Sequence, residues 1–102
     1  MSKPRVELQI ELEKIIGSRN VYFQPPPTFM IQYPCIIYTL SNDKVDYANN
    51  NRYKEMNRYS VILIDKDPDS VFLKQIKKMP YCSFDRTYVS DNLNHYSFTI
   101  FY

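Results

Sequence analysis

A chain of 102 residues with 44% apolar and 24% charged residues has the length and composition of one folded domain, which argues against wholesale disorder. Lysine and arginine number 13 against 11 aspartate and glutamate residues, for a net charge of +2. Because the basic residues are spread along the chain, the charge does not demand a nucleic-acid partner.

The first expected element is an amphipathic helix over residues 4–16, where apolar side chains recur at close to helical spacing. Its apolar positions are Val6, Leu8, Leu12, Ile15 and Ile16. Gly17, the only glycine, follows directly, and a helix C-terminus favours a left-handed residue there. A mechanical role therefore explains this glycine, and no phosphate-binding loop is implied.

Residues 19–24 predict a short strand, which the proline tract at 25–27 ends with a stiff, extended connection. An X-Pro dipeptide then opens a second, strongly β-forming run over residues 33–40. Residues 41–57 are the most polar part of the chain and predict a projecting loop with room for a short strand at 44–47.

The clearest strand in the chain is the run at 58–65, whose unbroken apolar centre is typical of a strand in the middle of a sheet or covered on both faces. Asp67 is placed to cap a following helix, Pro68 suits the first helical position and Pro80 stops the run. The expected inner side of this second helix consists of Val71, Phe72, Ile76 and Met79.

A terminal hairpin is predicted from two β-like runs, residues 81–90 and 95–102, joined by a turn at 91–94. Alternation in the last run gives one apolar side, made of Tyr96, Phe98, Ile100 and Tyr102. The predicted fold class is α+β, as a single domain over residues 1–102. A mainly antiparallel sheet of about four to five strands carries two helices, in the order α-β-β-(β)-β-α-β-β.

Catalytic and zinc chemistry find little support in the sequence. His95 is the only histidine, and a catalytic pair with Cys82, Asp85 or Asp91 would need a geometry that sequence does not reveal. An ordinary hydrogen-bonded histidine on a strand is the favoured interpretation. Two cysteines and one histidine without close spacing fall short of a four-ligand zinc site. We expect no enzyme activity, no metal and no cofactor.

The acidic run Asp65, Asp67 and Asp69 resembles the start of a calcium loop. The glycine required at the sixth position is absent, and Ile76 stands where the loop needs glutamate. A helix cap therefore explains these carboxylates better than a calcium site.

Cysteine usage and hydropathy bear on the compartment. Cys35 and Cys82, with no apolar leader in the sequence, favour reduced thiols in a cytoplasmic product. Apolar runs are far shorter than the roughly 20 residues needed to span a bilayer, so we expect a soluble protein. The 10 tyrosines and 6 phenylalanines favour a binding surface, because tyrosine offers a large contact area at low entropic cost.

Several stretches together resemble a small family of neck proteins from long-tailed phages and prophages of Gram-positive bacteria. The segments that carry the resemblance are 33–38, 47–53, 58–61, 65–70, 80–86 and 91–96. Pro80-Tyr81-Cys82-Ser83-Phe84-Asp85-Arg86 and Asp91-Asn92-Leu93-Asn94-His95-Tyr96 are the most specific of them. The family pattern has acidic residues where this chain has Asn49 and Asn50, which affects only charge-based contacts of that loop.

The resemblance implies a tail terminator, also described in this family as a tail completion or minor capsid protein. Such proteins assemble as a ring, typically six-fold, on the head-proximal end of the tail tube, stop its growth and present a surface to the head connector. The implied partners are other copies of the chain, the tube protein and the connector, with DNA only passing through the ring. The implied location is the virion neck, after assembly in the bacterial cytoplasm.

For the contacts of this ring, we expect the 47–53 loop and the Asp85-Arg86 region to be used. The expected contact residues are Tyr47, Asn49, Asn50, Arg52, Tyr53, Asp85 and Arg86. Because neighbouring residues on a strand point to opposite faces, we expect Asp85 and Arg86 each to meet a cross-strand partner or another subunit rather than to form a catalytic pair.

Two alternatives stay open at the level of sequence. The first is an adjacent neck protein that joins tail to head or closes the portal without setting tail length. The second is a small module that binds single-stranded nucleic acid by stacking bases on Tyr59, Tyr88 or Tyr96. No cluster of basic residues supports this second alternative.

Overall fold

The computed structural model describes residues 4–26, 30–41 and 57–102, which form two helices and five strands. The elements in chain order are α1 (Arg5–Ile16), β1 (Val21–Phe23), β2 (Cys35–Ser41), β3 (Arg58–Asp65), α2 (Leu73–Lys77), β4 (Cys82–Ser90) and β5 (Leu93–Phe101). The expected strand at 44–47 lies outside the described residues. None of the described helices is long and apolar enough to cross a membrane.

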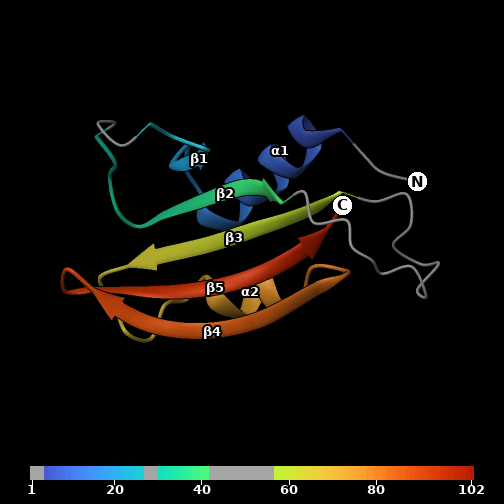
Figure 1. Ribbon diagram of the computed structural model, residues 1–102. Coiled ribbons are helices and arrows are strands. Elements are labelled where there is room, and N and C mark those ends of the chain that lie inside the picture. The colour runs from blue at the N-terminus through green and yellow to red at the C-terminus, as the bar shows by residue number, and fades with distance from the viewer. Residues whose placement is uncertain (1–3, 27–29, 42–56) are drawn as a thin grey trace.

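The five strands form one sheet in the order β1-β2-β3-β5-β4 (Figure 1). Only β1 and β2 are parallel, and every other neighbouring pair is antiparallel. β3 lies between β2 and β5, as its apolar centre predicted for a strand in the middle of the sheet. The predicted α+β class with a mainly antiparallel sheet and two helices is therefore confirmed.

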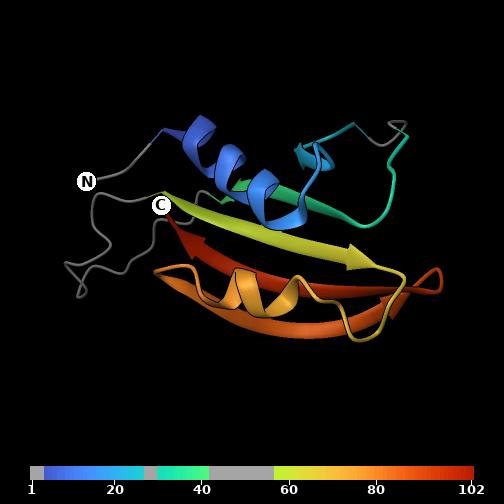
Figure 2. The same cartoon turned by 180° about the vertical axis from the view of Figure 1, so that it is seen from behind.

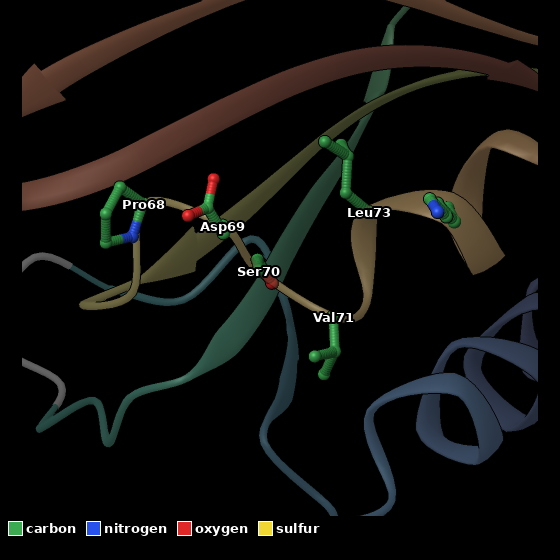
Figure 3. Close-up of a pocket in the computed structure, with 6 residues that line it drawn as sticks. Pro68, Asp69, Ser70, Val71 and Leu73 are labelled. Atoms are coloured by element: carbon green, nitrogen blue, oxygen red, sulfur yellow. The ribbon is translucent and has the colours of Figure 1, made fainter.

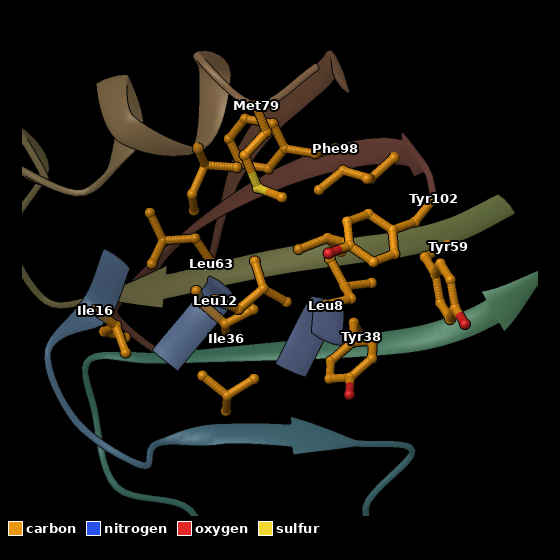
Figure 4. Close-up of a cluster of buried hydrophobic side chains, with 14 of the residues drawn as sticks. Leu8, Leu12, Ile16, Ile36, Tyr38, Tyr59, Leu63, Met79, Phe98 and Tyr102 are labelled. Atoms are coloured by element: carbon orange, nitrogen blue, oxygen red, sulfur yellow. The ribbon is translucent and has the colours of Figure 1, made fainter. Parts of the chain in front are cut away.

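Both helices lie on the same side of the sheet (Figure 2). α1 contacts β1 and β2, and α2 contacts β4. Because side chains alternate across a strand, every second residue of the sheet points at the helices. Together with the inner residues of both helices, these residues form the buried cluster of Figure 4. Its fully buried members include Leu8, Leu12, Ile36, Tyr38, Val61, Leu63, Ile76, Phe98 and Ile100.

The inner side of α1 differs from the prediction at its first turn. Leu8, Leu12 and Ile16 are buried, and Ile15 packs against the cluster, but Val6 is 56% exposed. Leu8, Leu12 and Ile16 follow the i, i+4, i+8 spacing of one helix side, and Val6 is two residues from Leu8, so it lies on another side. Gly17 has a φ of 75° and its amide donates to the carbonyl of Glu13, as expected of a helix C-terminus.

The second helix is shorter than predicted and begins later. α2 starts at Leu73, and neither Asp67 nor Pro68 belongs to its first turn. The Asp67 carboxylate instead accepts the amide of Asp69, and the Ser70 hydroxyl accepts the amide of Phe72. These local turns satisfy the backbone before the helix begins, which is the usual competition between such side chains and helical structure.

Of the eight tyrosines among the described residues, four lie in the core and four are half-buried or exposed, so the expected tyrosine-rich binding surface stays a prediction. Tyr38, Tyr59, Tyr96 and Tyr102 are all at most 7% exposed. The polar tips of three of them are bonded: Tyr38 donates to Gln9, Tyr96 to the carbonyl of Pro68 and Tyr102 to Glu11. Tyrosine therefore fills the core while its hydroxyl ties α1 and the 66–72 loop to the sheet.

The terminal hairpin is tighter than the expected turn at 91–94. Only Asp91 and Asn92 turn the chain, with φ values of 54° and 62°, and β5 already begins at Leu93. A two-residue turn with positive φ at both positions matches the twist of the flanking strands. Asp91 and Asn92 thus adopt the left-handed conformation that glycine often supplies in such turns.

The sheet side away from the helices is called the open face here (Figure 1). No helix among residues 4–26, 30–41 and 57–102 covers it. By the strand registers its residues include Ile37, Thr39, Ser60, Ile62, Ser83, Tyr88, His95, Ser97 and Thr99. All of these side chains are half-buried or exposed. By the same registers Cys35 and Ile64 also lie on the open face, and both are buried, so its half-buried and exposed residues rather than the whole face are available for contacts.

Leu63 and Leu40 both lie on the helix side of the sheet, and their different burial predicts different effects of the same truncation. Leu63→Ala empties a fully buried site and should lower the free energy of unfolding by about 2–5 kcal/mol. Leu40→Ala, at a leucine 42% exposed on the neighbouring strand, should cost under about 1 kcal/mol. Urea titrations of both variants measure the difference, and equal losses would contradict this account of the core.

Candidate interaction surface

Of the seven expected contact residues, the structure describes only two. Tyr47, Asn49, Asn50, Arg52 and Tyr53 lie outside the described residues. Asp85 and Arg86 lie near the middle of β4, and both side chains are exposed.

A β-bulge in β4 decides where these two side chains point. Phe84 pairs with Phe98, but Arg86 pairs with Ser97, so Asp85 is an extra residue in the ladder. The Thr99 hydroxyl of the open face donates to the Asp85 carboxylate over 2.8 Å. Arg86 also lies on the open face, with its guanidinium carbon 5.1 Å from the ring centre of Tyr88. The expectation that the two charges face opposite ways is therefore wrong, because the bulge interrupts the alternation.

Arg86 is the outermost member of a stack on the open face. The rings of Tyr88 and His95 are 4.8 Å apart and nearly parallel, with an angle of 19° between their planes. His95 also places Nδ1 3.0 Å from the carbonyl oxygen of Leu93. The Tyr88 ring thus contacts the Arg86 guanidinium in a cation–π interaction and the His95 imidazole in an aromatic stack. The arrangement gives β4 and β5 an amphipathic surface that includes a positively charged side chain.

Cys82 is separated from the histidine with which a catalytic pair was considered. Cys82 pairs with the core residue Ile100 and lies on the helix side, whereas His95 lies on the open face. Burial, and secondarily the charge of Asp85, raises the pKa of the Cys82 thiol to about 11. Burial, and secondarily the charge of Asp65, raises the pKa of Cys35 to about 12. Both groups are thiols rather than thiolates at neutral pH, so neither is activated as a nucleophile.

In the acidic loop before α2, the carboxylates of Asp65 and Asp67 accept hydrogen bonds from backbone amides of the same loop. Asp65 accepts the amide of Asp67 over 3.1 Å, and Asp67 accepts the amide of Asp69 over 2.9 Å. A hollow next to this loop is lined by Pro68, Asp69, Ser70, Val71, Leu73 and Lys74 (Figure 3). Its buried hydroxyl, that of Ser70, already accepts a backbone amide. No group of three metal-ligating side chains occurs in the described ranges of the chain.

Two of the three tyrosines proposed as stacking platforms for bases lie in the core. Tyr59 is 2% exposed and Tyr96 is 5% exposed, and both point toward the helices. Only Tyr88 lies on the open face, where His95 already covers one side of its ring. Stacking of bases on Tyr59 and Tyr96 is therefore excluded, because alternation along β3 and β5 turns both rings inward.

Sequence reasoning missed the contribution of Tyr88, His95 and Thr99 to the surface around Asp85 and Arg86. The pairing of β4 with β5 was predicted, but only the observed two-residue turn places Tyr88 beside His95, because the predicted turn at 91–94 would pair Ser90 with His95. The position of Thr99 beside Asp85 could not be obtained in this way, because the bulge shifts the register by one residue.

Comparisons with known proteins add no relative. The chain matches no protein-family model, and no similar curated protein or solved structure was found.

The raised thiol pKa values predict slow reaction of both cysteines with a thiol reagent in the folded protein. At pH 8, the thiolate fraction of Cys82 should be about a hundredfold smaller than that of a cysteine with a pKa of 9.0, because its pKa is about 11. Rates measured with and without urea, in the protein and in Cys82→Ser, test this. Fast reaction of native Cys82 at pH 8 would contradict the burial of its sulfur.

Proposed function

We propose that this protein is a structural component of the head–tail neck of a long-tailed phage, and that it acts as the tail terminator. In this role it forms a ring on the head-proximal end of the tail tube, stops polymerisation of the tube and offers a surface to the head connector. The ring is six-fold, as the resemblance implies, and the chemistry is that of protein contact rather than catalysis.

The observation that carries the proposal is the exposure of the most specific motif behind the resemblance. Residues 80–86 lead into β4 and form its first half, and Phe84 is 40% exposed while Asp85 and Arg86 are exposed. Core packing explains why buried positions of the motif hold apolar residues, but it does not explain why exposed positions hold charged ones. An arginine and an aspartate on a sheet face without a helix over it are suited to contact with another protein.

The shape of the surface also suits a ring. A cyclic assembly uses heterologous contacts, in which two different patches of each subunit meet. The open face with the Arg86, Tyr88 and His95 stack offers one patch, and the outer side of α1, with Val6 56% and Ile10 47% exposed, offers a chemically different one. The proposal assigns ring and tube contacts to the Asp85-Arg86 region and to residues 47–53.

Deletion of the gene from its phage or prophage, followed by electron microscopy of the particles, tests the proposal. A terminator caps a growing polymer, so its loss should leave tails of irregular and excessive length beside unattached, DNA-filled heads. Supplying the wild-type chain from a plasmid should restore tails of uniform length joined to heads.

Two other outcomes of the deletion have distinct meanings. Tails of uniform length that fail to join heads would replace the terminator with an adjacent head–tail joining protein. Normal, infectious particles would overturn the virion role altogether.

A further inference from the structure

The outer edge of β4 is the least protected strand edge in the described part of the chain. β4 has nine residues, and among those parts of the chain no strand pairs with it on the side away from β5. At the other end of the sheet, β1 has only three residues, and Pro25 follows it closely. The carbonyl of Val21 in β1 accepts a hydrogen bond from the side-chain amide of Gln9. Short length, a side-chain bond and proline protect that edge, whereas β4 presents a long row of backbone groups.

One hydrogen bond and the geometry of the hairpin turn fix which peptide groups of β4 point outward. The amide of Phe101 donates to the carbonyl of Tyr81 over 3.1 Å, so Tyr81 faces β5 and the alternation turns Cys82 and Phe84 outward. Beyond the bulge, the two-residue turn makes Ser90 and Leu93 the inward pair. Counting back from Ser90, the same alternation turns two further residues outward. The outward set is therefore Cys82, Phe84, Thr87 and Val89.

The same four residues direct their side chains to the helix side of the sheet. Cys82, Phe84 and Thr87 pair with Ile100, Phe98 and Tyr96, which all lie in the core cluster. The remaining residues of β4 lie on the open face, including both Asp85 and Arg86 because of the bulge. The order along the strand is thus helix side, open face, helix side, then two residues on the open face, then the alternation resumes.

We propose that this edge is an interaction surface for a second copy of the chain, which adds its own β4 antiparallel about a two-fold axis through the bulge. Asp85 then lies opposite Arg86 of the second copy, and Arg86 opposite its Asp85. Phe84 pairs with Thr87 and Cys82 with Val89. The outward peptide groups of one β4 thereby lie opposite outward peptide groups of the other and can form hydrogen bonds. Side chains that lie opposite each other point to the same face of the joined sheet.

No other register satisfies both conditions along the strand. A shift by one residue pairs helix-side with open-face residues on both sides of the bulge, and a shift by two does so at the bulge itself. A bulge commonly protects a sheet edge, because it twists the edge away from a regular partner. Here the two bulges lie opposite each other at the centre of the pairing. The bulge therefore favours pairing with a second β4, which has the same bulge, over pairing with a regular strand.

Side-chain chemistry supports the same register. The opposed Asp85 and Arg86 occur twice around the axis, and opposite charges on facing strands attract. On the helix side, Phe84 is 40% exposed and Val89 is 68% exposed. In this register the Phe84 ring is diagonal to Val89 of the second copy, so pairing would cover both apolar side chains.

The pairing goes beyond the proposed neck function and does not rest on it. A two-fold dimer is closed, whereas a ring is cyclic, and the dimer would cover the Asp85-Arg86 region assigned to ring contacts. Pairing of free subunits and assembly into a ring would therefore compete for this region. Its test uses the purified protein alone, so its outcome is independent of any phage experiment.

Sedimentation equilibrium over a wide range of protein concentration tests the pairing with a charge swap. The wild-type chain should dimerise reversibly. In Asp85→Arg and in Arg86→Asp, residues 85 and 86 carry like charges, and they face each other at both positions around the axis. Each variant should therefore weaken dimerisation by about tenfold or more. The double variant restores opposite charges in reversed order and should dimerise within a few-fold of the wild type. Circular dichroism checks that each variant is folded.

Val89→Asp gives a second disruption that leaves the bulge intact and should also weaken the dimer. A wild-type chain that stays monomeric at every concentration would overturn the proposal. So would a double variant that associates no better than the single variants, because the loss would then not come from the paired charges. An oligomer that none of the substitutions affects would place the self-contact on another surface.

Discussion

The alternation of side chains across the central strands is the constraint on which the rest of the structure depends. In β3 and β5 every second residue is buried against α1 and α2, and the fully buried Val61, Leu63 and Phe98 belong to this set. Because both helices lie on one side, the helix side carries the packing energy. The main core does not depend on the open face, which can therefore carry charged and polar residues without destabilising the core.

Among the strand pairs of the described residues, the bulge in β4 is the one place where the register shifts, and it changes which side chains lie on the open face. One inserted residue, Asp85, brings two opposite charges to the same face, beside the stacked Tyr88 and His95. Bulges often redirect side chains where a sheet meets a partner. The proposed structural role in an assembly and the proposed pairing with a second copy both use this surface, in different ways.

Much of the fold could be predicted because its signals are local. The predicted strand at 58–65 coincides with β3, Gly17 ends α1, and the inward residues of β5 were identified from their alternation. Helix α2 was predicted too long, since the turns formed by Asp67 and Ser70 compete with a cap. The bulge could not be predicted, because it depends on how β4 is held against β5 rather than on the sequence of β4.

The central claim is that the exposed Asp85-Arg86 region serves assembly rather than folding. Complementation of the deleted phage with Arg86→Glu, measured as infectious titre, tests it most directly, with Lys78→Glu as a charge reversal of an exposed residue at the end of α2. We expect Arg86→Glu to lower the titre at least tenfold while its melting temperature stays close to that of the wild type, and Lys78→Glu to complement fully. Full complementation by a folded Arg86→Glu protein would contradict the account.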